Sequence, residues 1–434
     1  MKFPRFLLSC TTIISAVLAP AAALANITVN GKSYSSGVRL NTANATWTIS
    51  GTASGYVQVQ QNCTIILDNV TWTDPTTKTD AMQITDGLTV TLKLKGANKI
   101  TCSASDGRQT GIRVTSNTTL NITNLTDDAS LTVTATAAYR DCAIGGSYND
   151  NTSSSACGTI NIYGGNITAR SGVYCAGIGG FGTGSSTAAK KGAGGIIRVY
   201  GGSVYAYGGG TTGGGAGIGG GYYGSGGAFY NYGGTVYATR GSSGAADIGI
   251  GAEGSSTTAT FYMAGGSTGL ANGSVTGMAG AKNPAGERVY RVLVQNLVAG
   301  RKYTFAGLSD NLSYTYGQNN LVADASGVIH LWLPNGTHNF EDDDYGYSAT
   351  VASAKTTATR TAKVTVTFND SDGTTIVAVK GLPGASLSAP PNPVKKGFTF
   401  TGWSQSVPET FPGESVVMTA QWKKVRKGFM MVVY

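Results

Sequence analysis

Tyrosine and arginine side chains recur at a fixed interval in the glycine-rich middle of the chain, where Tyr237 stands 32 positions after Tyr205. A tyrosine ring offers an apolar face that can cover the C–H surface of a pyranose, and its phenol can hydrogen-bond sugar hydroxyls. An arginine adds donors for carboxylates or hydroxyls. The bland alternative is that stacked aromatic residues only stabilise neighbouring strands. The candidate binding set is Arg198, Tyr200, Tyr205, Tyr207, Tyr230, Tyr232 and Tyr237.

Groups that perform hydrolysis, nucleophilic attack or metal binding are scarce. The chain has two histidines, His330 and His338, and between residues 158 and 280 its only acids are Asp247 and Glu253. Glycoside hydrolysis needs paired carboxylates, and calcium needs several oxygen ligands together. We therefore expect no catalytic residue, no metal and no cofactor. Four other aspartates, which we expect in loops, are Asp127, Asp128, Asp141 and Asp150.

The composition and the first residues indicate an exported protein. Only 12% of residues are charged, and no stripe of lysine and arginine marks a nucleic-acid binder. Residues 1–25 carry a basic start, an apolar run and Ala-Leu-Ala before Asn26, the layout of a signal peptide. Without Lys2 and Arg5 the net charge falls from +9 to +7 (9 − 2). No later segment is long and apolar enough to predict a transmembrane helix, so we expect a secreted or cell-surface location.

Short segments in which apolar residues alternate with other residues recur at similar intervals along the chain. These segments must position the candidate tyrosine and arginine side chains. A Gly-Gly bend and a second short strand follow most of them, and a third segment places a mostly small residue before isoleucine. Three short strands per unit of about thirty residues are typical of a parallel β-helix, with glycines at its corners. The apolar pairs are Leu92/Leu94, Leu120/Ile122, Ile160/Ile162, Ile197/Val199, Phe229/Asn231 and Phe261/Met263, in which Asn231 is the polar exception.

This periodicity predicts one right-handed parallel β-helix over residues 26–286. Residues between the apolar positions should point outward, which places the tyrosines on the outer wall. A formal dinucleotide fingerprint, Gly215-x-Gly217-x-x-Gly220, lacks the helix that such a site requires and is a by-product of composition. The predicted interior stack is Leu92, Leu120, Ile160, Ile197, Phe229 and Phe261.

The cysteines indicate neither a zinc site nor a full disulfide framework. Five remain after the signal peptide, an odd number, and no CxxC occurs. Alignment of Gly177-Ile178 with Ala143-Ile144 shifts Cys175 one place from Cys142, which predicts opposite sides of the wall and no bridge between them.

The glycine-rich rungs resemble the bacterial carbohydrate-binding parallel β-helix family. The similar segments are "TIILDNVTW" (64–72), "VTLKLKGANKIT" (90–101) and the repeated "AGIGG". The resemblance implies a non-catalytic β-helix that binds polysaccharide, in some members with calcium and acidic plant polymers. The scarcity of acids on the later rungs argues against calcium in this chain.

A second resemblance lies near the C-terminus. "VTVTFNDSDG" (364–373), "PPNPVKKGFTFTGW" (390–403) and "MTAQW" (418–422) are similar to one internalin-type B repeat, the Listeria–Bacteroides repeat of bacterial surface proteins. The resemblance implies a small β-grasp-like module over residues 362–424. We expect its aromatic residues to form a core rather than a ligand site. The matching positions are Gly397, Phe398, Phe400, Gly402, Trp403 and Trp422.

Residues 287–361 are predicted to be a separate small β domain, and the threonine-rich stretch 353–361 a linker. "EDDDYG" (341–346) is predicted to be an exposed acidic loop rather than a cation site, and residues 425–434 a tail. The predicted fold is thus all-β: the β-helix, the small β domain and the β-grasp-like repeat module.

The leading functional hypothesis is a secreted bacterial cell-surface protein whose β-helix binds polysaccharide, neutral or acidic, without catalysis. Its partners would be a polysaccharide and a cell wall or host surface, and no nucleic acid. An adhesin or spacer without glycan specificity is the alternative, and a polysaccharide lyase or hydrolase is less favoured. The sequence does not name the sugar.

Overall fold

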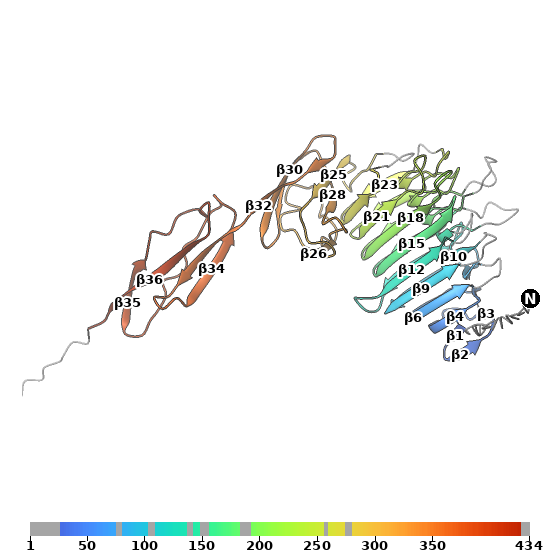
Figure 1. The fold of residues 1–434 in the computed structure, drawn as a ribbon, viewed down its shortest axis with the longest axis horizontal. Coiled ribbons are helices and arrows are strands. Elements are labelled where there is room, and N and C mark those ends of the chain that lie inside the picture. The colour runs from blue at the N-terminus through green and yellow to red at the C-terminus, as the bar shows by residue number, and fades with distance from the viewer. Residues whose placement is uncertain are drawn as a thin grey trace, which may run out of the picture.

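The computed structural model describes residues 27–74, 80–102, 109–136, 142–147, 156–182, 192–255, 259–273 and 280–426, and every regular element in these ranges is a β-strand (Figure 1). A β-helix, a small β domain and a repeat module follow one another along the long axis of the molecule. The predicted signal peptide lies outside the described residues. The all-β prediction is confirmed.

The strands of the β-helix form three faces in which strands of successive rungs pair in parallel. Face 1 contains β8 (Thr89–Lys95), β11 (Thr119–Asn124), β14 (Thr159–Ile162), β17 (Ile196–Val199), β20 (Ala228–Asn231) and β23 (Thr260–Met263). Face 2 contains β9 (Ala97–Cys102), β12 (Ser130–Ala135), β15 (Asn166–Val173), β18 (Ser203–Gly209), β21 (Thr235–Thr239) and β24 (Ser267–Leu270). Face 3 contains β3 (Gly37–Leu40), β5 (Tyr56–Val59), β7 (Met82–Ile84), β10 (Thr110–Arg113), β13 (Cys142–Gly145), β16 (Ile178–Gly179), β19 (Ile218–Gly219) and β22 (Ile248–Gly249).

The first rungs join faces 1 and 2 through two long strands, β4 (Thr46–Ser54) and β6 (Cys63–Asp74). The first half of β6 pairs with β8 and its second half with β9. The hairpin of β1 (Ile27–Val29) and β2 (Lys32–Tyr34) pairs antiparallel with β4 and covers this end of the stack. The parallel stacking therefore begins behind an antiparallel cap.

The interior column of face 1 follows the predicted register from β11 onward. Ile160 pairs with Ile197, which pairs with Phe229, and all three side chains are buried. The earlier part of the prediction is wrong, because Leu120 pairs with Val90 and not with Leu92. A slip of two residues keeps the same side chains inside, so the alternation of apolar residues does not fix this register.

Face 3 shows why glycine follows isoleucine in the units from β13 onward. Ile178 pairs with Ile218 and Ile218 with Ile248, as the repeat predicts. Gly219 has a φ of 131°, and a Cβ there would lie 2.1 Å from the carbonyl oxygen of Gly249 in the next rung. Only glycine fits this position, because the rungs approach through their backbones.

The polar exception Asn231 is completely buried and its side chain holds a corner together. Its Oδ1 accepts hydrogen bonds from the backbone N–H groups of Gly233 and Gly234, at 3.0 and 2.9 Å. Its amide donates to Gly234 O, Ser267 O and Thr268 Oγ1. Asn231 thus replaces the apolar residue of other rungs and satisfies buried backbone groups.

The predicted placement of two cysteines is wrong. Cys142 and Cys175 do not point to opposite sides of the wall but pack together with Phe181 in one buried cluster. All four residues of β13 are buried, so burial does not alternate along this short strand. Cys142 and Cys175 are not joined to one another in the structure. Whether they stay unbridged in solution is still a prediction.

The small β domain consists of short strands with their own apolar core. The predicted linker is wrong, because its threonines form β31 and β32, which pair with β25 and β30. Threonine is β-branched and suits strands as well as linkers. The strands are β25 (Val289–Val294), β26 (Lys302–Tyr303), β27 (Leu321–Val322), β28 (Ile329–Pro334), β29 (Gly336–Glu341), β30 (Tyr345–Val351), β31 (Thr356–Thr357) and β32 (Thr359–Ala362).

This domain is docked on the last rung of the β-helix. The Trp332 ring packs edge-on against Phe261 with centroids 5.0 Å apart, and its Nε1 donates to Thr268 O at 2.9 Å. The backbone N–H of Gly317 donates to Ala264 O at 2.9 Å. Trp332 is part of the β-helix core cluster, so the two domains share buried apolar surface.

The repeat module is a four-stranded sheet in the order β34-β33-β36-β35, with β33 and β36 parallel. Phe368 is fully buried and Trp403 packs against it at 4.8 Å between ring centroids. The predicted aromatic core is only partly correct, because Phe398 is 38% exposed and Phe400 and Trp422 lie outside the core cluster. The strands are β33 (Val364–Asn369), β34 (Thr375–Gly381), β35 (Phe398–Trp403) and β36 (Val416–Lys424).

Candidate functional site

Face 1 carries a ladder of three parallel tyrosine rings. Tyr163, Tyr200 and Tyr232 each follow the end of a strand in successive rungs, so the strand register places them above one another. Ring centroids are 4.8 Å apart for both pairs, with interplanar angles of 7° and 8°. Because the rings cover one another's faces, Tyr200 presents mainly its edge and its hydroxyl to the outside.

A second column runs beside this tyrosine ladder and adds a positive charge. Arg198 and Tyr230 are register partners, and the guanidinium carbon lies 5.3 Å from the centre of the Tyr230 ring. The Tyr230 and Tyr232 rings are parallel, with centroids 6.1 Å apart. The structure therefore brings together four of the predicted residues, namely Arg198, Tyr200, Tyr230 and Tyr232.

The other three predicted residues lie around the corner on face 2. Tyr205 pairs with Tyr237, and the Arg170 guanidinium carbon lies 3.7 Å from the centre of the Tyr207 ring. The seven candidate residues therefore lie on two faces, because the Gly201-Gly202 bend turns the chain between them.

The small β domain also reaches face 2. The His330 ring lies 6.4 Å from that of Tyr237, and Val322 N donates to Thr235 Oγ1 at 3.1 Å. Burial raises the pKa of Tyr205 and Tyr237, and the carboxylate of Asp324 raises both further. Tyr205 and Tyr237 point outward from their strands, but both are half-buried near the docked domain.

Carboxylates are missing from the outward positions of the described strands of face 1 from β8 to β23. These positions hold lysine, threonine, asparagine, arginine and tyrosine, together with the apolar residues Ala228 and Ile196. Within the described ranges, no group of three or more histidine, cysteine, aspartate or glutamate residues is placed to hold a metal ion. Face 1 is therefore suited to hydrogen bonding and apolar contact with a ligand.

The acidic turn 341–346 is closed by its own hydrogen bonds and by the repeat module. Asp342 Oδ1 accepts from the backbone N–H groups of Asp344 and Tyr345, at 2.8 and 2.7 Å. Lys380 Nζ lies 2.7 Å from Asp344 Oδ1 and lowers the pKa of that carboxyl. These carboxylates serve a domain contact.

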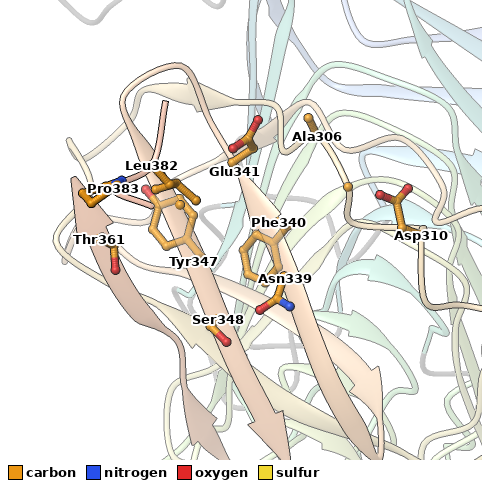
Figure 2. A pocket seen from close by; sticks show the side chains of 12 residues that line it. Ala306, Asp310, Asn339, Phe340, Glu341, Tyr347, Ser348, Thr361, Leu382 and Pro383 are labelled. Carbon is orange, nitrogen blue, oxygen red and sulfur yellow. The ribbon is translucent and has the colours of Figure 1, made fainter. Parts of the chain in front are cut away.

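A cavity of about 550 Å³ lies at the same junction (Figure 2). Figure 2 shows Leu382 and Pro383 of the repeat module beside Tyr347 of the small β domain. The carboxyl groups of Asp310 and Glu341 line the cavity, and Glu341 is 3.4 Å from Lys363. None of the predicted site residues lines it.

Sequence reasoning missed one member of the tyrosine ladder as a site residue. Tyr163 occupies the same position after its strand as Tyr200 and Tyr232, and its side chain is 50% exposed. The signal was present in the repeat, because all three tyrosines directly follow the second inward position of their strands, which Ile162, Val199 and Asn231 occupy. Beside Tyr163 lies a cleft of about 220 Å³ that also contacts the small β domain.

Comparison with known proteins finds a family match for one part of the chain. Residues 365–418 match the Listeria–Bacteroides repeat domain, which confirms the predicted repeat. No curated protein matches the chain. Among the described residues, no helix is long and apolar enough to cross a membrane. A repeat of this family joined to a parallel β-helix is compatible with a cell-surface protein.

Proposed function

We propose that the chain is a secreted bacterial cell-surface protein that binds polysaccharide through face 1 of its β-helix, without catalysis. The observation that carries the proposal is the grouping of Arg198, Tyr200, Tyr230 and Tyr232 in register on neighbouring rungs. Rungs repeat at a spacing of about 4.8 Å. A polymer that lies along the β-helix therefore meets a similar set of groups at each rung.

The stacked rings favour hydrogen bonding over stacking as the main contact along the tyrosine ladder. Tyr200 has a tyrosine on each face, so its phenol and ring edge are what remain for a ligand. Each contact is weak, and several at regular spacing add up for an extended chain but not for a monosaccharide. The Arg198 guanidinium can bind a carboxylate through two parallel hydrogen bonds, which favours an acidic polymer.

The absence of outward carboxylates on the described strands of face 1 supports a binding role without catalysis. Glycosidases place two carboxyl groups within about 5–10 Å of each other across the scissile bond. Asp324, whose carboxylate adds to the effect of burial in raising the pKa of the face 2 residues Tyr205 and Tyr237, is hydrogen-bonded to His330 at 2.9 Å and belongs to the docked small β domain.

An adhesin or spacer without glycan specificity is the second candidate. The match of residues 365–418 to a repeat domain favours it, as does the arrangement of three domains along one axis (Figure 1). In this alternative the tyrosine ladder only stabilises the stacked strands.

Affinity electrophoresis of the full chain through gels that contain neutral or acidic polysaccharides tests the proposal. We expect at least one polymer to retard the wild type. Arg198→Ala should weaken retardation most in an acidic polymer, and Tyr200→Ala in every polymer that binds. Tyr205→Ala on face 2 is the matched control and should migrate like the wild type. If no polymer retards the wild type, or if only Tyr205→Ala loses retardation, face 1 is not the binding site.

A further inference from the structure

The cleft beside Tyr163 lies where a corner of the β-helix meets the small β domain. Its volume is about 220 Å³, below the roughly 300–1,000 Å³ of pockets for drug-sized ligands, and suits one sugar ring. Both the β-helix and the small β domain contribute polar side chains to its lining, and Asn124 and Ser203 of the β-helix stand beside six others. These six are Asp127, Tyr163 and Asn166 from the β-helix, and Lys302, Gln318 and Asn320 from the small β domain.

Tyr163 is the first ring of the tyrosine ladder in chain order. One ring face stacks on Tyr200, whereas its register neighbour in the preceding rung is Thr123, which has no ring. At the other end, Tyr232 meets the tilted ring of Tyr262 at 5.8 Å. The half-exposed Tyr163 is therefore the ring of this ladder that keeps an apolar face for a ligand.

Polar side chains around the cleft are not engaged with one another. Within the described part of the chain, Asp127, Lys302 and Gln318 make no side-chain hydrogen bond or ion pair, and the same holds for Asn166 and Asn320. By contrast, Lys95 elsewhere on the β-helix is paired with Asp68 at 2.9 Å. The groups around the cleft thus have donors and acceptors available for hydroxyl groups.

Glycines at the corner shape the wall of this cleft. A Cβ at Gly164 would lie 2.0 Å from Asn124 Oδ1, and one at Gly233 would lie 2.9 Å from Gln318 Cβ. The missing side chains allow Gln318 of the small β domain to approach the β-helix closely. The cleft therefore depends on both domains.

We propose that this cleft holds one neutral pyranose unit of the bound polysaccharide, stacked on the free face of Tyr163. Asp127, which lies toward the preceding rung, accepts hydrogen bonds from the hydroxyls of this unit. Gln318 lies beside Gly201 and Gly233, on the Tyr200 side of the ring, and contacts the next unit of the polysaccharide together with Lys302 and Asn320. Asp127 and Lys302 balance in charge, so the cleft selects a hydroxyl-rich ring rather than a charged one. The polysaccharide continues from the stacked unit past Tyr200. This inference rests on the proposed function and defines the specific subsite of that face.

The test measures binding of the full chain to a polysaccharide that retards the wild type, by isothermal titration calorimetry. Tyr163→Ala should weaken binding about tenfold, since it removes an aromatic contact. Tyr163→Phe keeps the ring face and should stay within about twofold of the wild type. Tyr222→Ala is the matched control, because Tyr222 also stacks on a tyrosine, Tyr174, at 5.1 Å but follows a strand of face 3. It should bind like the wild type.

The exposed Asn320→Ala variant tests the contribution of the small β domain without altering the tyrosine ladder, and should weaken binding several-fold. If the wild type binds no polysaccharide, the proposed function itself fails. If Arg198→Ala weakens binding while Tyr163→Ala and Asn320→Ala do not, the proposed function stands and the cleft is not a subsite. Equal losses in Tyr163→Ala and Tyr163→Phe would overturn the stacking contact.

Discussion

For replacement of the buried Asn231 by valine, the repeat pattern and the structure predict opposite changes in stability. The register partner of Asn231 in the preceding rung is Val199, so the pattern treats Asn231→Val as a repair that should stabilise the β-helix. In the structure, valine would leave the backbone N–H groups of Gly233 and Gly234 without their acceptor. Both glycines are buried, so water does not replace the lost bonds freely.

The expected loss follows from these groups. A buried donor left unsatisfied costs about 1–3 kcal/mol, which gives about 2–6 kcal/mol for two. Burial of the valine side chain returns about 1.5 kcal/mol. We therefore expect Asn231→Val to lower the free energy of unfolding by roughly 0.5–4.5 kcal/mol.

Urea unfolding followed by circular dichroism measures this difference from the shift in midpoint at unchanged slope. Asn161→Val is the matched control, because Asn161 lies on the outer side of the same face and makes one side-chain bond, to Asn121 at 2.9 Å. Its stability should change by about 1 kcal/mol or less. If Asn231→Val is as stable as the wild type or more stable, the corner network does not hold the fold as described.

Further predictions concern the glycines of face 3, the buried Asp80 and the two cysteines Cys142 and Cys175. Gly219→Ala should cost more than about 2 kcal/mol in urea unfolding, because of its positive φ and the close Gly249 carbonyl, whereas Gly413→Ala, with open space around it, should cost far less. Burial raises the pKa of Asp80 from 3.8 to about 6, so the folded chain binds this proton more tightly than the unfolded chain. The resulting stability is present below pH 3.8 and is lost as the pH rises through 6. The wild type should thus lose roughly 1–3 kcal/mol relative to Asp80→Asn between pH 4 and 7, and a constant difference would contradict this. Peptide mapping without reduction should show no Cys142–Cys175 bridge, and a bridged peptide would refute the prediction.

Periodicity predicted most of the β-helix because its unit repeats one physical constraint. Ile178, Ile218 and Ile248 must all enter the core at the same point of each rung, and the sequence shows this directly. The partner of Leu120 could not be predicted in the same way, because Val90 and Leu92 are both apolar and two residues apart.

The candidate site was predicted less well, because exposure depends on contacts between distant segments. The outward direction of Tyr205 and Tyr237 follows from strand alternation. That Asp324 and His330 lie near them depends on how the small β domain docks, which no local pattern contains. The repeat contains the position of Tyr163 in the tyrosine ladder, but its cleft could not be predicted, because the cleft exists only where two domains meet.

The two caps of the β-helix determine how the molecule can assemble. A stack of parallel rungs is open at both ends, and its last strands would otherwise recruit strands from a second molecule into a fibre. The β1–β2 hairpin covers one end, and the small β domain contacts the last rung through Trp332 and Gly317 at the other. The length of the stack is therefore set within one chain, so that neighbouring molecules do not polymerise end to end.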